Sequence, residues 1–358
     1  MKPRRVVVVG AGLAGARVAE TLRARGFDGD VVLLGAEPVA PYERPALSKE
    51  YLAGTRRASQ LALRPPGFWP SRAIELRLGE PVVGVDYGRR VVVTCRGAEL
   101  AWDALVLATG ARARRLPIDA PGAHSLRTLA DAAALRRELA PGRRLLLIGG
   151  GFVGAEVAST ASALGLEVAV LEAGPAPLAR QLGDQVGTVL AARYREHGIE
   201  LHTNASVRSI ERGPTSKGVV AVLGDGRRVP ADTALVAVGV EPERTLLPPC
   251  PVQAVYACGD VAGAGHWTSA AHDAVAVAHR ILGLEPPPAP PPYVWSDQLG
   301  LRLQLVGAPG DATDVELEGS EGSFAARYRR SDGRLVAALL ANRPDEVAGL
   351  RRELAFAA

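Results

Sequence analysis

The sequence predicts an α/β protein with two dinucleotide-binding units and a smaller α+β segment at its C-terminal end. Two glycine-rich runs with the spacing G-x-G-x-x-G, the first and second fingerprints, carry this prediction. Each run follows a short apolar stretch typical of a strand buried on both faces, and each precedes a stretch of helical composition. An acidic residue follows the next apolar stretch in both units, as in nucleotide-binding β-α-β folds. A stiff proline-rich linker at 285–292 then leads into the final segment.

The first unit begins with a predicted strand at Val6–Val9 and a predicted helix at 16–25. In the run between them, one glycine permits a tight turn and the next lets the backbone approach a pyrophosphate. The last lets helix pack on strand. These glycines are Gly10, Gly12 and Gly15. The free N–H groups at the start of the helix suit phosphate, and Glu37, just beyond a second strand at 31–34, suits a ribose hydroxyl.

The remainder of the first unit contains short strands at 82–85 and 90–95. A buried strand starts at Ala104 and runs into Thr109 and Gly110. This Thr-Gly ending resembles the junction that closes the first part of the FAD domain in flavoproteins with two dinucleotide sites. The alternative is an ordinary junction between a strand and a turn.

The second unit repeats the pattern after an amphipathic helix at 129–139. A strand at 145–148 precedes the second glycine run, which consists of Gly149, Gly151 and Gly154. The next strand, at 168–171, ends in Glu172, close to the expected spacing of about 20 residues. Two such runs predict two dinucleotides, and therefore a flavin site and a nicotinamide site. The alternative is a duplicated unit whose second site is silent.

Glu172 bears on the choice between NADH and NADPH. A carboxylate at this position accepts a hydrogen bond from the ribose 2′-hydroxyl of NADH and repels the 2′-phosphate of NADPH. The sequence therefore predicts a preference for NADH, which the nearby Arg180 can weaken.

Composition excludes several other classes of protein. A chain of 358 residues is long enough for two or three domains. No apolar run approaches the ~20 residues of a membrane helix, and no nucleic-acid-binding motif is present. The three cysteines are far apart and predict neither a dithiol nor a zinc site, so we expect no metal and small buried cysteine side chains. The net charge of +4 slightly favours an acidic partner.

The segment YERPALSKEYL, after the second predicted strand, resembles the putidaredoxin reductase and rubredoxin reductase family of FAD-dependent, NADH-oxidising ferredoxin reductases. The resemblance implies that Arg44 contacts the FAD pyrophosphate and that Lys49 lies beside the flavin ring. It also implies that Glu156, in the helix predicted to follow the second glycine-rich run, pairs with Lys49. Lysine is rare in this chain, which has only Lys2, Lys49 and Lys217. The alternative is a proline-stiffened surface loop with solvated charges.

Later segments extend the resemblance over nearly the whole chain. ALVAVGVEPE contains Gly239 at the return to the FAD domain, and YACGDVAG contains Gly259 and Asp260, which the resemblance places at the ribityl chain. The helix that begins near Trp267 would direct its N-terminus at the flavin, and W-S-D-Q places Trp295 against it. The family's pattern is interrupted before Tyr256, where a short proline-rich connection replaces a longer segment.

The resemblance implies a glutathione-reductase-like flavoprotein with an α+β interface domain. The expected FAD-binding domain is 1–112 with 239–290, the NAD-binding domain 113–238 and the C-terminal interface domain 291–358. The implied function is a cytoplasmic NADH:ferredoxin reductase, monomeric or homodimeric, that uses FAD to supply an oxygenase. Lys49, Glu156 and Trp295 are its candidate catalytic surroundings. Alternatives are a flavoprotein NADH oxidase or small-molecule reductase, and a flavin- and NADH-binding sensor resembling apoptosis-inducing factor.

The expected partner is an acidic iron–sulfur ferredoxin, with no nucleic acid and no membrane insertion. The final segment is rich in arginine and would dock this partner if those arginines share a face. The alternative is scattered, solubilising charge. The arginines are Arg302, Arg327, Arg329, Arg330, Arg334, Arg343, Arg351 and Arg352.

Overall fold

A computed structural model of the protein describes residues 3–213, 218–320 and 322–356. The chain forms two compact units, each assembled from three separate segments. Unit 1 consists of Met1–Glu43, Ser59–Arg112 and Glu241–Ala289, and unit 2 consists of Arg44–Ala58, Ala113–Val240 and Pro290–Ala358. The division differs from the expected domain boundaries, because residues 44–58 and the C-terminal segment group with the second fingerprint.

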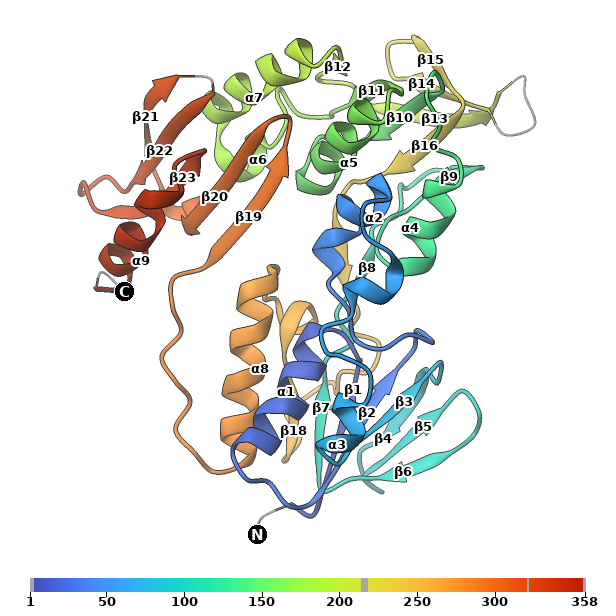
Figure 1. Ribbon diagram of the computed structural model, residues 1–358, viewed down its shortest axis with the longest axis vertical. Coiled ribbons are helices and arrows are strands. Elements are labelled where there is room, and N and C mark those ends of the chain that lie inside the picture. Colours follow the sequence, from blue (N-terminus) through green and yellow to red (C-terminus); the bar gives the residue numbers. More distant parts are fainter. Residues whose placement is uncertain (1–2, 214–217, 321, 357–358) are drawn as a thin grey trace. The chain divides into compact units, whose positions relative to one another are not determined.

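Unit 1 is built on a parallel sheet with the strand order β18-β7-β1-β2-β3 (Figure 1). The predicted strands of the first fingerprint unit are confirmed. The strands are β1 Arg5–Val9, β2 Asp30–Gly35, β3 Ile74–Leu78, β7 Ala104–Leu107 and β18 Val255–Ala257. Its helices and 3-10 turns are α1 Leu13–Ala24, η2 Ala58–Leu61, α3 Phe68–Ser71, η3 Gly259–Ala262 and α8 Trp267–Ile281.

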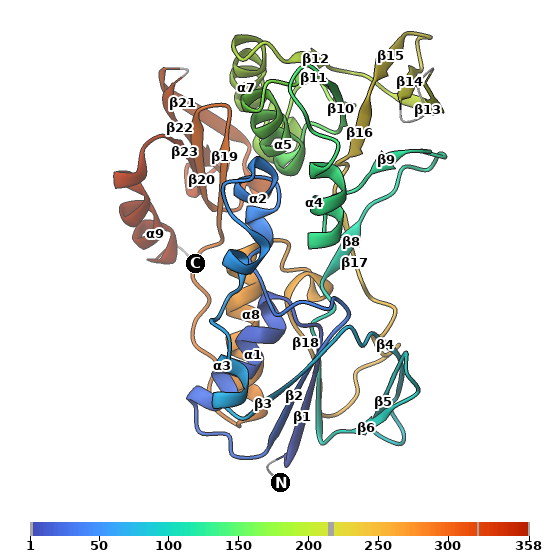
Figure 2. The same ribbon diagram turned by 45° about the vertical axis from the view of Figure 1, so that its right-hand side comes forward.

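Alternate residues of the central strands enter two different cores. Val6 and Val8 of β1 face α1 and α8, while Val7 and Val9 face the opposite core. That second core is covered by an antiparallel sheet, on the other side from α1 and α8 (Figure 2). Both faces of the sheet are thus apolar, which explains why the strands read as continuous apolar runs. The covering strands are β4 Val82–Asp86, β5 Val91–Thr94 and β6 Glu99–Ala101.

The short connection before Tyr256 packs on this second core. Leu246 and Leu247 join the cluster that contains Val82 and Val85, and the Tyr87 hydroxyl donates to the Leu246 carbonyl. The proline-rich connection is therefore held by apolar contacts of its own.

Unit 2 contains a second parallel sheet, with the order β12-β11-β10-β16-β9. The predicted strands of the second fingerprint unit are confirmed as well. The strands are β9 Ala123–His124, β10 Arg144–Ile148, β11 Glu167–Leu171, β12 Glu200–His202 and β16 Thr233–Val236. Helical elements are η1 Arg44–Ala46, α2 Glu50–Ala53, α4 Leu129–Arg136, α5 Phe152–Ala163, α6 Ala179–Leu182 and α7 Asp184–Glu196. An antiparallel sheet accompanies them: β13 Val207–Arg212, β14 Val219–Leu223 and β15 Arg228–Ala231. The strands β8 Ala111–Ala113 and β17 Val240–Pro242 pair with each other.

Residues 44–58 belong to unit 2 because α2 is part of its core. Leu52 is 1% exposed and packs in the cluster that contains Leu135 of α4 and Ala155 of α5. The α4 helix begins at a capping box in which the Thr128 side chain and Asp131 satisfy each other's backbone N–H groups.

The C-terminal segment forms an antiparallel sheet with the order β19-β20-β23-β22-β21. One face packs on Leu182 and Val186 of α6 and α7, and the other packs on Leu350 and Leu354 of α9. The Tyr328 hydroxyl also donates to the Leu182 carbonyl at 2.8 Å. The elements are β19 Tyr293–Gln298, β20 Leu301–Gly307, η4 Pro309–Asp311, β21 Asp314–Ser320, β22 Ser323–Arg329, β23 Leu335–Ala341, η5 Pro344–Glu346 and α9 Val347–Phe356. β22 pairs antiparallel with β23, and helix α9 closes the segment, as expected for an α+β domain.

Candidate functional site

The first fingerprint turn admits only glycine at two of its positions. Gly10 has a φ of +114°, and a Cβ there would lie 2.0 Å from the Ala108 carbonyl oxygen. A Cβ on Gly15 would lie 1.9 Å from the Gly10 oxygen, so helix α1 packs closely on the turn. Gly12, at the N-cap of α1, has open space around it. The turn thus presents unobstructed backbone at a helix N-terminus, the arrangement that binds a pyrophosphate.

The second fingerprint turn repeats this geometry in unit 2. Gly149 has a φ of +106°, and a Cβ there would lie 2.5 Å from the Ala237 oxygen. A Cβ on Gly154 would approach the Gly149 oxygen to 2.0 Å, while Gly151 at the N-cap of α5 is open. Each unit therefore carries one turn whose shape fits a dinucleotide phosphate.

The acidic residues predicted for ribose binding are held in place by neighbouring groups. The Glu172 carboxylate accepts hydrogen bonds from the backbone N–H groups of Gly150 and Gly174, each at 2.7 Å. These contacts fix it beside the second fingerprint turn. Glu37 accepts a hydrogen bond from the Tyr42 hydroxyl at 2.8 Å in unit 1. Arg180 is exposed on α6.

The later motif of unit 1 lies against the first turn of α1. Gly259 has a φ of +77°, and a Cβ there would lie 2.9 Å from the Ala14 side chain. This close approach places the half-buried Asp260 of η3 near the α1 N-terminus. Trp267 begins α8 and lines a hollow that also includes Leu13 of α1.

The glycines that follow strands β7 and β16 have backbone conformations that favour glycine. Gly110 and Gly239 have φ values of +75° and +104°. The Thr109 hydroxyl donates to the Glu243 carbonyl at 2.6 Å, which ties the end of β7 to the chain that follows β17.

Lys49 and Glu156 form a buried ion pair in unit 2, as their predicted pairing requires. Lys49 Nζ lies 2.9 Å from Glu156 Oε1, and the two side chains are 13% and 8% exposed. Lys49 is therefore not a solvated charge on a surface loop, which was the alternative interpretation of this motif. Arg44 lies on η1 in the same unit, where its guanidinium donates to the Arg127 carbonyl.

Three further side chains of this cluster were not predicted to be site residues. Ser48 and Ser296 donate to the two carboxylate oxygens of Glu156, and Gln298 donates to the Ser296 hydroxyl at 3.1 Å. All three are 5% exposed or less. The alternation of β19 offered a signal, because it places Ser296 and Gln298 on one buried face, where polar side chains need partners.

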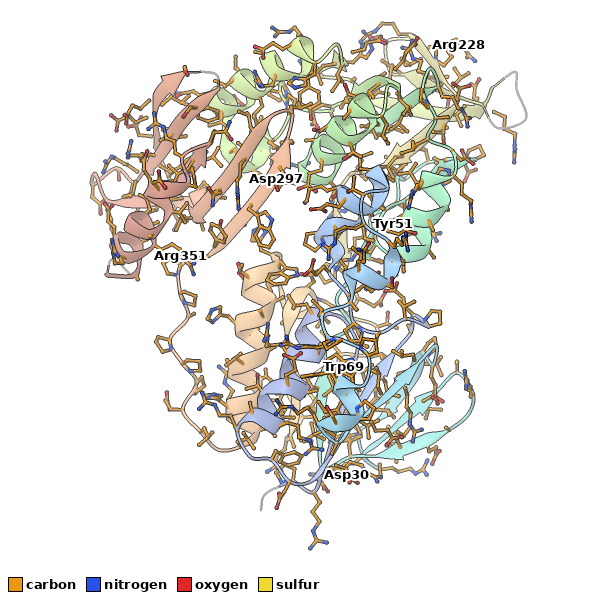
Figure 3. All side chains as sticks on the ribbon, viewed as in Figure 1. Asp30, Tyr51, Trp69, Arg228, Asp297 and Arg351 are labelled. Atoms are coloured by element: carbon orange, nitrogen blue, oxygen red, sulfur yellow. The ribbon has the colours of Figure 1, made fainter. Side chains whose placement is uncertain are left out.

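The other face of β19 carries an aromatic stack. The rings of Tyr293 and Trp295 are stacked with centroids 6.1 Å apart, and the Arg351 guanidinium lies 5.4 Å from the Tyr293 centroid. Figure 3 labels Asp297 on β19 and Arg351 on α9 within this part of unit 2. The stack links Trp295 to an exposed positive charge.

The arginine-rich final segment does not form an unpaired basic face over the residues that the structure describes. Residues 293–358 contain eight arginines and ten acidic residues, so their net charge is −2. Four of these arginines face carboxylates of the same sheet and its flanking turns: Arg327 with Glu318, Arg329 with Glu316, Arg330 with Asp311 and Arg343 with Glu346. The register of the β21–β22 hairpin brings two of these pairs together, those of Arg327 and Arg329.

The expectation for the cysteines is correct at one position and wrong at two. Cys258 is buried, and burial together with the charge of Asp273 raises its thiol pKa to about 12. Cys95 and Cys250 are exposed, because both lie in turns outside the core.

The described part of the chain contains no helix long and apolar enough to cross a membrane.

Comparison with known proteins places this geometry among reductases. Residues 4–250 match the family model described as pyridine nucleotide-disulphide oxidoreductase, and residues 293–358 match the model described as reductase C-terminal. The chain is 36% identical over 372 residues to the biphenyl dioxygenase system ferredoxin–NAD(+) reductase component of Paraburkholderia xenovorans, covering 94% of this chain and 90% of that protein. It is 34% identical over 378 residues to a putidaredoxin reductase of Pseudomonas putida, covering 95% and 89%.

A solved structure agrees with these sequence matches. The chain resembles one in the crystal structure of the covalent putidaredoxin reductase–putidaredoxin complex, with a TM-score of 0.92 and 31% identity. The match covers 98% of this chain and 93% of that one.

Proposed function

Because the chain belongs to the pyridine nucleotide-disulphide oxidoreductase family, we propose that it is an FAD-dependent reductase that passes electrons from NADH to a ferredoxin serving an oxygenase. The presence of two open fingerprint turns in one chain carries this proposal, because it provides for two dinucleotides. The relatives named as ferredoxin–NAD(+) and putidaredoxin reductases support the choice of acceptor.

We assign FAD to the first fingerprint and NADH to the second. In this assignment the α1 N-terminus would hold the FAD pyrophosphate, Glu37 would bind a ribose hydroxyl, and Asp260 would accept from the ribityl chain. The family resemblance assigns Arg44 to the pyrophosphate as well. The α5 N-terminus and Glu172 hold NADH. Residues 1–112 with 239–290, 113–238 and 291–358 act as FAD-binding, NAD-binding and interface domains.

The bound flavin would supply the chemistry, taking hydride from NADH and releasing single electrons. The contribution of the chain is to bind, orient and tune it. Lys49 would supply an ammonium to the flavin ring, and Glu156 pairs with that ammonium at 2.9 Å. The partial positive charge at the N-terminus of α8, where Trp267 lies, favours negative charge on the ring. Trp295 would provide an aromatic surface for the flavin.

The purified protein should be yellow and release about one FAD per chain on denaturation, as expected for one FAD fingerprint. Chromatography of the released cofactor identifies it, and stopped-flow mixing of the reduced protein with a ferredoxin tests the acceptor. Release of FMN, or no flavin uptake after reconstitution, would overturn the assignment. Reoxidation by air faster than by every ferredoxin tried would favour an oxidase.

Glu172→Ala should narrow the preference for NADH over NADPH by about 1–3 kcal/mol, the range for a hydrogen bond to a charged group. The ratio of kcat/KM values for the two cofactors measures this change. Glu167→Ala, at the exposed start of the same strand, is the control and should leave the ratio unchanged. Equal kcat/KM values in the unmodified protein would show that Arg180 or another basic side chain governs the choice between NADH and NADPH.

We further propose that the ferredoxin is acidic and docks at the stack of Arg351, Tyr293 and Trp295. Arg351→Glu should raise the KM for ferredoxin severalfold at low salt and have less effect at high salt, where the screening length falls below ~10 Å. Arg330→Glu is the matched control, because Arg330 is already paired with Asp311 at 2.6 Å. Reduction by NADH should be unchanged in both variants. Equal effects of the two reversals would place the docking surface elsewhere.

A further inference from the structure

Three segments that are far apart in the sequence converge on the carboxylate of Glu156. Ser48 and Lys49 reach it from the chain before α2, Glu156 itself lies on α5, and Ser296 reaches it from β19. Ser296 donates to Oε1 at 2.7 Å, the same oxygen that Lys49 contacts at 2.9 Å, while Ser48 donates to Oε2. The carboxylate therefore accepts three hydrogen bonds and has little freedom to rotate.

The direction of the hydrogen bond from Ser296 is determined by Gln298. A serine hydroxyl has one proton to donate. Since the Gln298 amide donates to Ser296 Oγ at 3.1 Å, the Ser296 proton is directed to Glu156. The buried face of β19 thus delivers a hydrogen-bond donor to the Glu156 carboxylate.

The strand that carries Ser296 is itself fixed against α5. The turn after β19 contains Leu299, which is 1% exposed and packs in the core of unit 2. Its N–H donates to the Ser159 hydroxyl of α5 at 2.9 Å. On the same helix, one turn beyond Glu156, the Thr160 hydroxyl donates to the Ser48 carbonyl at 2.8 Å. Helix α5 therefore holds the Ser48–Lys49 backbone and the β19 hairpin at once.

We propose that Ser296, oriented by Gln298, and Ser48 are positioning residues that fix Glu156 and thereby hold the Lys49 ammonium in one orientation. The inference rests on the proposed function, in which this ammonium faces the flavin. It gives the C-terminal sheet a part in flavin reduction besides any contact with ferredoxin. Within the described chain, Glu156 is the acceptor that orients Lys49, so any rotation of the carboxylate moves the ammonium.

The scarcity of lysine allows a direct test on the full-length protein. Labelling with ¹³C,¹⁵N-lysine gives side-chain NMR signals from Lys2, Lys49 and Lys217 only, and Lys49→Met identifies the signal of interest. We expect the Lys49 signal to be distinct in the unmodified protein and to move toward that of a solvated lysine in Ser296→Ala and in Ser48→Ala. An unchanged Lys49 signal in both variants would overturn the proposal. This readout does not depend on turnover or on ferredoxin.

A kinetic arm tests the consequence for the flavin. Ser296→Ala should lower the limiting rate of flavin reduction by NADH about tenfold, the loss expected for a hydrogen bond to a charged group, with an unchanged KM for NADH. In a Glu156→Gln background the same substitution should have little further effect, because the two residues act through one carboxylate. An equal loss in both backgrounds would overturn the inference.

Gln304→Leu is the matched control for disturbance of the sheet. Gln304 is buried on the neighbouring strand β20, and its amide donates to the Tyr293 hydroxyl at 2.7 Å instead of to the Glu156 cluster. We expect it to leave the Lys49 signal in place. A shift of the Lys49 signal without any change in flavin reduction would contradict the link to the flavin. Absence of flavin from the protein would contradict only the proposed function.

Discussion

Lys49→Met should produce a large loss in the rate at which NADH reduces the bound flavin. The substitution leaves the Glu156 carboxylate, with a side chain 8% exposed, without its cation. Breaking a buried ion pair by removing one partner costs about 3–5 kcal/mol. We therefore expect lower thermal stability of unit 2, a slower limiting rate of reduction and a shifted flavin midpoint potential.

Two comparisons make this prediction specific. Arg228→Met removes one partner of the Arg228–Glu211 pair, whose side chains are 56% and 46% exposed, and should cost less than about 1 kcal/mol. The double variant Lys49→Met/Glu156→Gln should lose less than the two single variants summed, because each single change leaves the other group unsatisfied. Strict additivity would mean that the two residues do not act as a pair.

Gly10→Ala should abolish the binding of FAD at one equivalent per chain. The alanine Cβ would lie 2.0 Å from the Ala108 oxygen, so the turn between β1 and α1 must move. The φ of +114° adds strain for a residue with a side chain. Overpacking costs about 1–3 kcal/mol and the left-handed backbone a further ~1–2 kcal/mol. Flavin content and the unfolding temperature measure the outcome.

Gly26→Ala separates these two contributions. Gly26 also has a positive φ, +80°, but a Cβ at this position would extend into open space, with no packed neighbour within 4 Å. We expect this variant to lose some stability and keep its flavin. Gly149→Ala, at the equivalent turn of unit 2, should keep FAD and lose reduction by NADH. If Gly149→Ala lost FAD and Gly10→Ala lost only the reaction with NADH, the cofactor assignment would be reversed.

The fingerprint turns could be predicted because their geometry is set locally. The strand before Gly10, the turn itself and the helix after it lie within one short stretch, and the same holds at Gly149. Close approach of backbone to backbone excludes side chains at these glycines, so the residue types alone identify the fold of each unit. The pairing of Lys49 with Glu156 followed from family resemblance, not from spacing.

The charge of the C-terminal segment shows what composition cannot decide. Its eight arginines suggested a basic docking face. The register of β21 against β22 places Arg327 opposite Glu316 and brings it within 2.7 Å of Glu318. Ion pairing depends on which residues face each other across the strands. The number of arginines therefore does not predict the electrostatic potential at the surface of this segment.

The sequence by itself determined the two nucleotide-binding units, their strands and the glycines that form the phosphate turns. Only the tertiary structure decided that residues 44–58 join unit 2, and that Ser48 and Ser296 meet at Glu156. Ser296 is separated from Glu156 by 140 positions, and no local pattern relates them. Their contact exists because Leu299 and Leu52 are buried in the same core, which brings β19 and α2 together at α5. Burial of apolar side chains is not directional, so it assembles distant segments whose polar partners cannot be identified before the chain is packed.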